Sequence, residues 1–513
     1  MEKLYNNIIL SDNFAEEMSD PQNIHYLKNP PEVIDISVGR QLFVDDFLIE
    51  ETDLTPEYHK AQKFSGNPIL SPEMPWEIEQ APVACPKSGG VWYDEKEKIY
   101  KMWYEGGWLH NMCYATSTDG INWDRPDLGL EKGTNKILLY EGYDKDKCFE
   151  GVDYLRPDSC SVIIDDNCDS SQRYKLFMRN PGGKSPGMVA VSEDGINFKD
   201  FKITSELYDR STIFYNPFRK KWVYSIRTAA DDGVDPESRM RSYRECDDLL
   251  EGATWNEKEE HMWLRSDDLD QPNPYIGMKP QLYNVDCIGY ESIMLGMFQI
   301  MRGPENDICL PLGIPKITEL MPMYSRDGYN FSRPSRECII NASMYKGAWD
   351  RGYVQSVSGG VIIHGDELWI YYIGFAGDEN YTSENYHWTE NGLYRNGATG
   401  LAKIRRDGFV SMNGNGVLLT RKLVFNGKSS MYINAVGKVS AELYTEDGNL
   451  IDTSSIFNGD STKAKLRFSN IDVSKLNGQV IRIKFNVEGK LYSFGFADEN
   501  GDFGGAHAAG IAE

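Results

Sequence analysis

Short apolar runs separated by polar turns recur along most of the chain. Residues 90–93 and 100–104 are two such runs, joined by the charged turn 94–98. Further pairs of runs occur at 161–164 and 174–178, at 212–215 and 222–226, and at 360–363 and 368–372. In a fourth unit, residues 291–298 form one long run, which reads as the first strand of that unit. Runs of this length that are rich in aromatic and β-branched residues predict strands.

An Asp-Gly turn follows most of these units. The clearest copies, in which Ser, Asp, Gly and an aromatic residue keep their spacing, are 117–123, 192–198 and 325–331, and weaker copies surround Asp248 and Asp407. Asp-Gly between two apolar runs is typical of a hairpin, because glycine accepts a positive φ at little cost. The turns follow one another at intervals of roughly 50 to 80 residues, and repeats on this scale are typical of propellers, solenoids or arrays. Five units of four strands each predict a five-bladed β-propeller.

The pattern changes at both ends of the chain. Beyond residue 412 a Gly-rich segment leads into strands that alternate apolar and polar residues, most clearly at 481–488. This alternation predicts a small β-sandwich over 413–513, whose last, small residues we expect to fray. Residues 1–35 carry little pattern and are expected to form an arm on the propeller, which itself takes 36–412. The predicted class is therefore all-β.

Composition narrows the range of partners. The net charge of −24 argues against nucleic acid or an anionic membrane as a partner, and no apolar run approaches the roughly 18 residues that span a bilayer. Aromatic residues make up 12 %, which suits strands and sugar-binding surfaces. The start of the chain does not read as a signal peptide, and the nine cysteines are scattered without a C-x-x-C pair. We expect a cytoplasmic protein with no metal or other cofactor, and the oligomeric state stays open.

Carboxylates recur where the first strand of a unit begins, and in a propeller these strand starts surround the mouth of the central channel. Aligned on their hairpins, the second and third units place Asp158 and Asp209 there, and the fourth offers Glu291 and, near the same level, Asp286. The first unit has Lys87 at this position, and Glu79 is the catalytic candidate from that unit. Cleavage of a glycosidic bond requires such a set, with one carboxyl protonated and another ionised. The alternative is that each acid only accepts hydrogen bonds from turn amides.

Arginines recur where the second strands end. Three of them, Arg179, Arg227 and Arg302, follow the second strands of units two to four, and Glu105 takes this place in the first unit. Each arginine could orient a catalytic carboxylate, or together they could bind an anion such as a uronic acid, a sialic acid or phosphate. Further candidates for substrate binding are Trp108, His110, Arg351, Gln355 and Trp388. Aromatic side chains among them could stack on sugar rings.

One stretch resembles a known group of enzymes. Asn-Pro-Ile-Leu-Ser-Pro at 67–72 and Trp-Glu at 76–77, followed by 91–94, 100–104 and 115–123, resemble the first blade of five-bladed β-propeller glycoside hydrolases of families 32, 43, 68 and 130. The resemblance covers roughly residues 40–412, and the C-terminal strands are similar in placement to the sandwich of family 32. It implies acids from successive inner strands, which by position are Asp158 and Asp209. The family 32 signature Asn-Asp-Pro-Asn-Gly is absent, and the first blade lacks its usual aspartate.

These observations predict a glycoside hydrolase that removes a terminal sugar from a small oligosaccharide or glycoside. Asp158 and Glu291 would perform the acid–base chemistry, and Asp209 would tune their pKa values or hold sugar hydroxyls. Two alternatives remain: a phosphate-dependent glycoside phosphorylase of the family 130 type, and a non-catalytic sugar-binding propeller. Retention or inversion at the anomeric carbon would depend on the separation of the two carboxyl groups.

Overall fold

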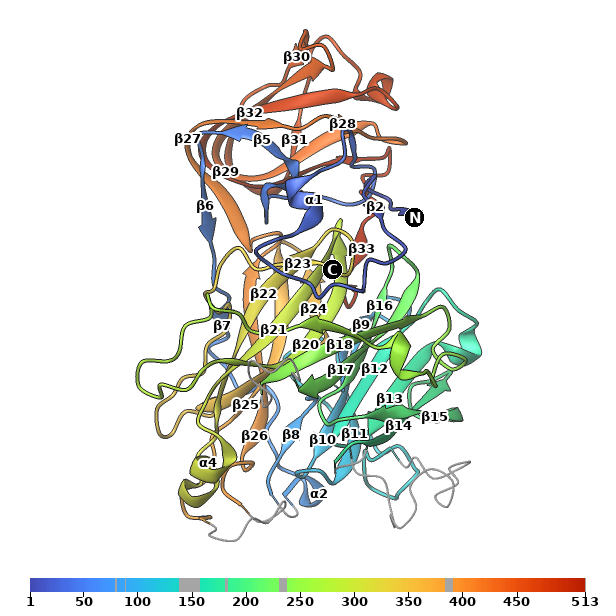
Figure 1. Cartoon of the computed structure of the whole chain (residues 1–513), viewed down its shortest axis with the longest axis vertical. Coiled ribbons are helices and arrows are strands. Elements are labelled where there is room, and N and C mark those ends of the chain that lie inside the picture. The colour runs from blue at the N-terminus through green and yellow to red at the C-terminus, as the bar shows by residue number, and fades with distance from the viewer. Residues whose placement is uncertain are drawn as a thin grey trace.

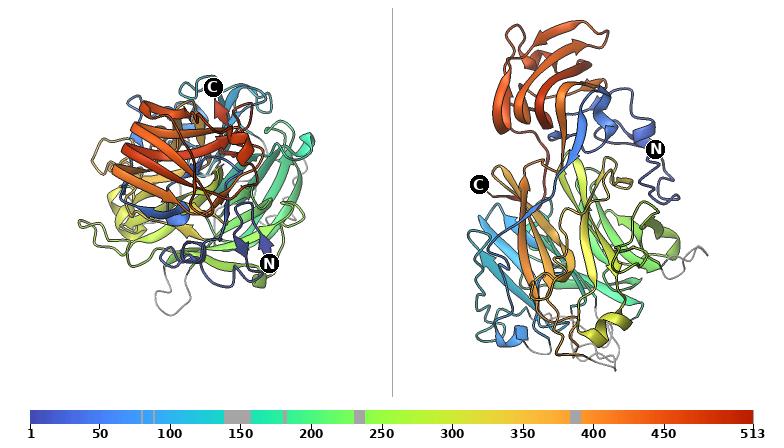
Figure 2. Two further views of the ribbon diagram at one scale, coloured as in Figure 1. Left: turned by 90° about the horizontal axis from the view of Figure 1, so that it is seen from above. Right: turned by 90° about the vertical axis from the view of Figure 1, so that its left-hand side faces the viewer.

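The computed structural model describes residues 1–78, 81–87, 89–137, 157–179, 183–229, 238–382 and 391–512. Five β-sheets form a ring, and a further curled sheet lies over one end of that ring (Figures 1 and 2). The innermost strands β9, β12, β16, β20 and β24 contact one another in a closed circle around the axis. The predicted five-bladed propeller is therefore confirmed.

Each blade is an antiparallel sheet, and the strands of blades two to four run outward from the axis in chain order. Blade one holds β8 (Ala84–Cys85), β9 (Val91–Asp94), β10 (Ile99–Gly106) and β11 (Asn111–Ser117). In this blade the first two strands, β8 and β9, both pair with β10. Blade two holds β12 (Ser159–Ile164), β13 (Tyr174–Arg179), β14 (Ser185–Ser192) and β15 (Lys199–Leu207), and blade three holds β16 (Thr212–Asn216), β17 (Lys221–Ala229), β18 (Arg239–Cys246) and β19 (His261–Leu264). Blade four holds β20 (Gln281–Glu291), β21 (Ile293–Gly303), β22 (Ile317–Ser325) and β23 (Phe331–Ser332), and blade five holds β24 (Gly352–His364), β25 (Glu367–Phe375) and β26 (Gly397–Arg405). The fourth strand of blade five is β7 (Gln62–Lys63), which pairs with β26 and closes the ring.

The Asp-Gly repeat joins neighbouring blades. In blade one, Asp119 Oδ1 accepts hydrogen bonds from the backbone N–H groups of Ile121 and Asn122, at 2.9 and 2.8 Å. The turn of blade two rests on blade one, because the indole N–H of Trp103 donates to the carbonyl of Gly195 at 2.6 Å. A Cβ on Gly195 would lie 2.6 Å from the Trp103 ring, and its φ of 77° also favours glycine.

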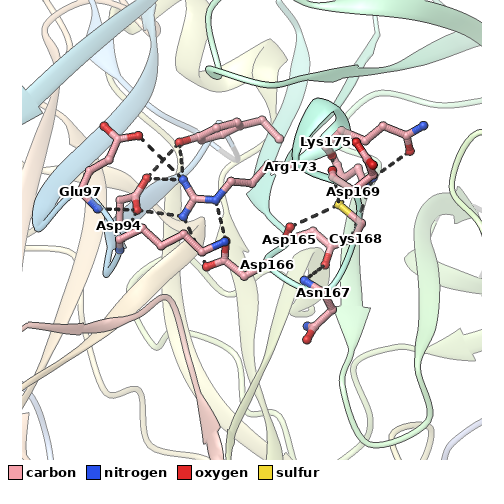
Figure 3. A network of polar contacts seen from close by, with 12 residues as sticks. Asp94, Glu97, Asp165, Asp166, Asn167, Cys168, Asp169, Arg173 and Lys175 are labelled. Atoms are coloured by element: carbon pink, nitrogen blue, oxygen red, sulfur yellow. Dashed lines mark hydrogen bonds and ion pairs between the residues drawn. The ribbon is translucent and has the colours of Figure 1, made fainter.

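Blades one and two are also joined by buried charges at their hairpin ends (Figure 3). Asp94 accepts from Arg173 Nη1 at 2.6 Å and from Lys101 Nζ at 2.9 Å, and Arg173 also pairs with Asp166. Burial would raise the pKa of the Asp94 carboxyl, but the two cations hold it well below its usual value. This carboxyl is fixed as an ion and serves the joint between the blades.

The C-terminal region forms one ten-stranded curled sheet. Its strands are β27 (Val410–Thr420), β28 (Leu423–Val424), β29 (Ser430–Thr445), β30 (Leu450–Thr453), β31 (Phe457–Leu466) and β32 (Ile481–Ala497), together with β3 (Ile34–Asp35), β4 (Gln41–Leu42), β5 (Ile49–Thr52) and β6 (Thr55–Tyr58) from the N-terminal side. Residues 34–58 therefore pair with this sheet, and the first strand that joins the propeller is β7.

The remaining elements are short. They are β1 (Glu2–Lys3), β2 (Ile9–Leu10), α1 (His25–Lys28), η1 (Asp46–Leu48), α2 (Pro75–Ile78), η2 (Ser170–Gln172), η3 (Glu257–Glu259), α4 (Asn306–Leu312) and η4 (Val473–Leu476). The N-terminal residues lie on blade three, where Tyr5 stacks on Phe218 with ring centroids 4.5 Å apart. In the described ranges no helix is long and apolar enough to cross a membrane.

The last residues of the chain return to the propeller. Strands β33 (Ala506–His507) and β34 (Ile511–Ala512) pair with β20 and β24. Between them, the Ala509 carbonyl accepts from the Tyr93 N–H at 2.8 Å, and the Ala509 N–H donates to Val361 at 2.9 Å. The expectation that this tail frays is wrong, because its small residues fit against the inner strands of blades one, four and five. A cavity of about 470 Å³ lies between the tail and the hairpin ends of the inner strands.

Candidate active site

The starts of the inner strands gather at the end of the propeller that faces away from the curled sheet (Figure 1). One residue from each blade stands at or next to such a start: Lys87, Asp158, Asp209, Tyr283 and Tyr353. We call this set the channel mouth. It brings two of the predicted carboxylates together with two tyrosines and a lysine.

Asp158 is positioned by the arginine that ends β13. Arg179 Nη1 lies 3.0 Å from Asp158 Oδ2, while the Arg179 Nε donates to the carbonyl of Leu207 at 3.1 Å. The Asp158 N–H also donates to the Arg179 carbonyl at 3.1 Å, which ties both ends of the pair to the blade-two sheet. The predicted pairing of an arginine with this acid is present.

Asp209 has the same arrangement one blade further on. It forms an ion pair with Arg227, whose backbone N–H donates to Ser211 Oγ at 3.0 Å. The side chain of Asp209 is 35 % exposed, compared with 14 % for Asp158, so Asp209 has the greater contact with solvent.

The environments of these two acids move their pKa values in opposite directions. Burial raises the pKa of Asp158, and the charge of Asp209 raises it further. Burial would also raise the pKa of Asp209, but Arg227 and Arg179 hold it below its usual value. Opposed shifts of this kind make Asp209 the group of the pair that ionises more readily.

Blade one contributes a lysine–glutamate pair in place of an aspartate. Lys87 Nζ lies 2.8 Å from Glu105 Oε2, and both side chains are at least nine-tenths buried. The ammonium also stands 3.9 Å from the ring centroid of Trp108, whose ring stacks on Tyr394 at 4.0 Å. Trp108 was expected to offer a face to a sugar, but it is 3 % exposed and contacts Lys87 and Tyr394. Burial raises the pKa of Glu105, against the effect of Lys87.

Blades four and five contribute a pair of phenols. The hydroxyls of Tyr283 and Tyr353 lie 2.6 Å apart, and both side chains are buried. Burial would raise the pKa of Tyr283, but Lys316 and Arg239 lower it. Tyr353 also has a φ of 50°, a backbone conformation in which strain is commonly stored at functional sites.

The structure places Glu291 at the opposite end of the propeller. It occupies the hairpin between β20 and β21, where Oε1 accepts from Arg406 Nη2 at 2.9 Å and Oε2 accepts from the Arg40 N–H at 3.0 Å. The expected position of Glu291 at the channel mouth is wrong, because the run 291–298 belongs mostly to the second strand of blade four. Its first strand is β20, which begins ten residues earlier at Gln281.

The other predicted residues are scattered. Arg302 contacts Glu319 on β22 at 3.3 Å, and Arg351 pairs with Glu379 at 2.8 Å. Gln355 is fully buried on β24. The structure places His110, partly exposed, in the turn after β10; Glu79 and Trp388 lie outside the described residues.

Several residues of the site were not predicted as site residues. They are Arg239, Tyr283, Lys316 and Tyr353. Lys87 and Glu105 were named only as the first unit's equivalents of the acids and arginines, and Asp286 was offered beside Glu291. Asp286 lies further along β20, accepts from Asn284 and Ser356, and has its pKa raised by burial. The alignment of strand starts could have found Tyr283 and Tyr353 once the blade-four hairpin was placed correctly. In the described part of the chain, no group of three or more His, Cys, Asp or Glu side chains is arranged to hold a metal ion.

No family model and no curated protein matches the chain. Among solved structures, an N-acetylgalactosamine deacetylase from F. plautii, in complex with blood group B trisaccharide, is similar, with 14% identity over 70% of this chain and 96% of that chain and a TM-score of 0.43. A thermostable family-43 glycoside hydrolase is similar with 14% identity, 66% and 97% coverage and a TM-score of 0.39. A β-1,2-mannobiose phosphorylase from Listeria innocua has 11% identity, 67% and 96% coverage and a TM-score of 0.41. The function proposed below rests on the geometry of the channel mouth.

Proposed function

We propose that this protein is a glycosidase that removes a terminal sugar from a small oligosaccharide or glycoside at the channel mouth. The observation that carries the proposal is the placement of Asp158 and Asp209 before neighbouring inner strands at the channel mouth, each paired with the arginine from the second strand of its blade. Their pKa values are shifted in opposite directions, which agrees with this placement. Cleavage of a glycosidic bond needs a protonated and an ionised carboxyl group on either side of that bond.

In this proposal Asp158 is the general acid. Burial and the charge of Asp209 raise its pKa, which favours the protonated carboxyl that donates its proton to the glycosidic oxygen as the bond to the anomeric carbon breaks. Asp209 stays ionised beside Arg227 and stabilises the positive charge that develops on the sugar ring. It then either attacks the anomeric carbon directly or takes a proton from the attacking water, according to its distance from Asp158 when substrate is bound.

A panel of nitrophenyl glycosides and fructans, with product release as the measurement, tests the proposal. Asp158→Asn should lose activity towards glycosides with poor leaving groups and retain more towards nitrophenyl glycosides, because a good leaving group needs no proton. Asp209→Asn should lose activity towards both kinds. Asp247→Asn, at a side chain that is 87% exposed, is the matched control and should behave as wild type. Wild-type turnover by Asp158→Asn and Asp209→Asn on every cleaved substrate would refute the assignment.

A phosphate-dependent phosphorylase is the second candidate. Arg227, Arg179 and Arg239 all act on the pKa of Asp209, and such a group of guanidinium ions could hold phosphate in place of the attacking water. Turnover with and without added phosphate decides between the two reactions. Sugar binding without any product release would instead favour a non-catalytic propeller.

We propose the cytoplasm as the place of action. The cysteines that the structure describes are free thiols, and most are buried. Recovery of the native protein from a cell-envelope or secreted fraction, with none in the cytoplasmic fraction, would contradict this proposal.

A further inference from the structure

Lys316 is a buried ammonium without a protein counter-ion. The residue directly precedes β22 and is 1 % exposed. Nζ makes no hydrogen bond or ion pair with any residue that the structure describes. The contacts of Nζ are with the rings of Tyr283 and Tyr353, at 5.3 and 5.6 Å from their centroids. Cation–π contacts near the limit of their range compensate only part of the penalty for removing an ammonium from water.

Two phenol hydroxyls and a second cation surround Lys316. Tyr283 and Tyr353 present hydroxyl groups 2.6 Å apart, and the guanidinium of Arg239 stands 5.1 Å from the ring centroid of Tyr283. Lys316 and Arg239 lower the pKa of the Tyr283 hydroxyl, which agrees with the position of both cations over its ring. We call these four residues the Lys316 cluster.

The Lys316 cluster adjoins the proposed catalytic pair. The charge of Asp209 acts on the pKa of Tyr283 in the direction opposite to that of Lys316. Tyr283 and Tyr353 both belong to the channel mouth, as Asp209 does. A group bound by Lys316 would therefore be part of the same sugar ring that reacts at Asp158 and Asp209, or of its neighbour.

We propose that the Lys316 cluster binds the carboxylate of an acidic sugar, so that the substrate is a glycoside with a uronic or other carboxylated residue. This inference rests on the proposed glycosidase function. Arg239 already has a partial counter-charge in Glu305, 3.5 Å away, and Asp209 is paired with Arg227. Lys316 is the cation of the cluster that has no carboxylate within ion-pair distance among the described residues. The carboxylate of a sugar would supply that partner.

Binding of free sugars tests the inference without requiring turnover. Galacturonate, glucuronate and N-acetylneuraminate should each bind more tightly than a neutral counterpart in isothermal titration calorimetry, and at least one should raise the melting temperature. Lys316→Met should weaken binding of the preferred acid at least tenfold, Lys316→Arg should restore part of it, and the neutral sugar should bind both variants as it binds wild type. Lys438→Met, at a side chain in the curled sheet that is 51% exposed, is the control for loss of one positive charge.

A second readout separates anion binding from a purely structural role. If the role of Lys316 is to bind an anion, the Lys316→Met variant without ligand should have a melting temperature equal to or higher than that of wild type. The reason is that the substitution removes a buried charge that has no counter-ion. If Lys316→Met does not fold, Arg239→Gln replaces it, with the same selective loss of acid binding expected.

The outcomes distinguish the inference from the proposed function. Lys316-dependent binding of an acidic sugar by a protein that cleaves no glycoside would leave the anion site standing and remove the glycosidase proposal. Cleavage of neutral glycosides, with no acidic sugar bound in a Lys316-dependent way, would overturn the inference alone. Tighter Lys316-dependent binding of inorganic phosphate than of any of the three acids would also overturn it.

Discussion

Replacement of Glu291 by Gln tests whether this glutamate stabilises the fold and takes no part in the catalysis proposed for Asp158 and Asp209. Glu291 is 4 % exposed and accepts hydrogen bonds from Arg406 and from the backbone of Arg40. Arg40 also pairs with Asp407 at 3.0 Å, so the buried Arg40 and the partly exposed Arg406 face two buried carboxylates between the propeller and the curled sheet. Glu291→Gln removes one negative charge and leaves this group with a net positive charge.

The expected loss follows from the burial of the group. Breaking a buried ion pair by removing one partner costs about 3–5 kcal/mol, and the amide oxygen of Gln can keep one of the accepted hydrogen bonds, so we expect about 3 kcal/mol of unfolding free energy. Turnover should stay as in wild type, because Glu291 lies in the β20–β21 hairpin, at the end of the propeller opposite Asp158. Asp158→Asn should show the reverse order, with a loss of roughly 10²–10⁴ in kcat on glycosides with poor leaving groups. Its loss of stability should be smaller than that of Glu291→Gln, because the Asp158 side chain is 14 % exposed, compared with 5 % for Glu291.

Urea unfolding followed by tryptophan fluorescence, together with kcat on the best substrate of the panel, measures both effects. Glu446→Gln is the matched control, since that carboxylate is 48% exposed and pairs with Lys422 at the surface. The reasoning is refuted if Glu291→Gln lowers kcat a hundredfold or more while the unfolding free energy stays within about 1 kcal/mol of wild type.

Three further predictions concern the same two ends of the propeller. The rate should follow a bell-shaped pH profile. It should rise with pH as Asp209 ionises at its lowered pKa, and fall as Asp158 loses its proton at its raised pKa. A profile without an alkaline limb would contradict the role of Asp158. Lys87→Met should move the alkaline limb to higher pH, because Lys87 lowers the pKa of Asp158; an unchanged or lower limb would count against that interaction. Gly510→Val should lower the melting temperature, since a Cβ there would lie 2.3 Å from the Tyr93 carbonyl oxygen and the φ of 112° disfavours a branched residue; an unchanged melting temperature would show that the tail does not hold the inner strands.

The five-bladed ring could be predicted from sequence because its signals are local. The Asp-Gly turns, with Asp119 and Asp194 as examples, carry their own hydrogen bonds within a few residues. Asp158 and Asp209 could be found for the same reason, since each stands at a fixed distance before a hairpin that the sequence marks with polar residues.

Blade four was misread because its hairpin has no sequence marker. Glu291 and Ser292 connect β20 to β21 directly, and Glu291 adopts a φ of 49° that would favour glycine or asparagine. Without a turn residue, the two strands appear as one continuous apolar run. The sequence reading therefore placed the start of the inner strand at Glu291, which is in fact the end of β20. Tyr283 was therefore missed and Glu291 taken in its place.

Lys316 could not be found from local pattern. It follows Gly313 and Pro315 in an irregular segment, where a lysine normally suggests a solvent-exposed side chain. Its burial comes from blade five, because the Tyr353 N–H donates to the Lys316 carbonyl at 2.7 Å and the Tyr353 ring covers its side chain. The pairing of β3 to β6 with the curled sheet could not be found from local pattern either, because these strands lie far from the C-terminal strands in the chain.

The closing strand β7 has a consequence for biosynthesis. Its partner β26 is translated only after all the other blades. Until then β7 has no strand to pair with, so the nascent polypeptide exposes the unpaired backbone groups of a strand edge until late in translation. A prematurely terminated polypeptide that lacks β26 cannot cover that edge at all. Such fragments should be clients of chaperones and prone to aggregate, whereas the finished toroid hides the edge within a closed circle.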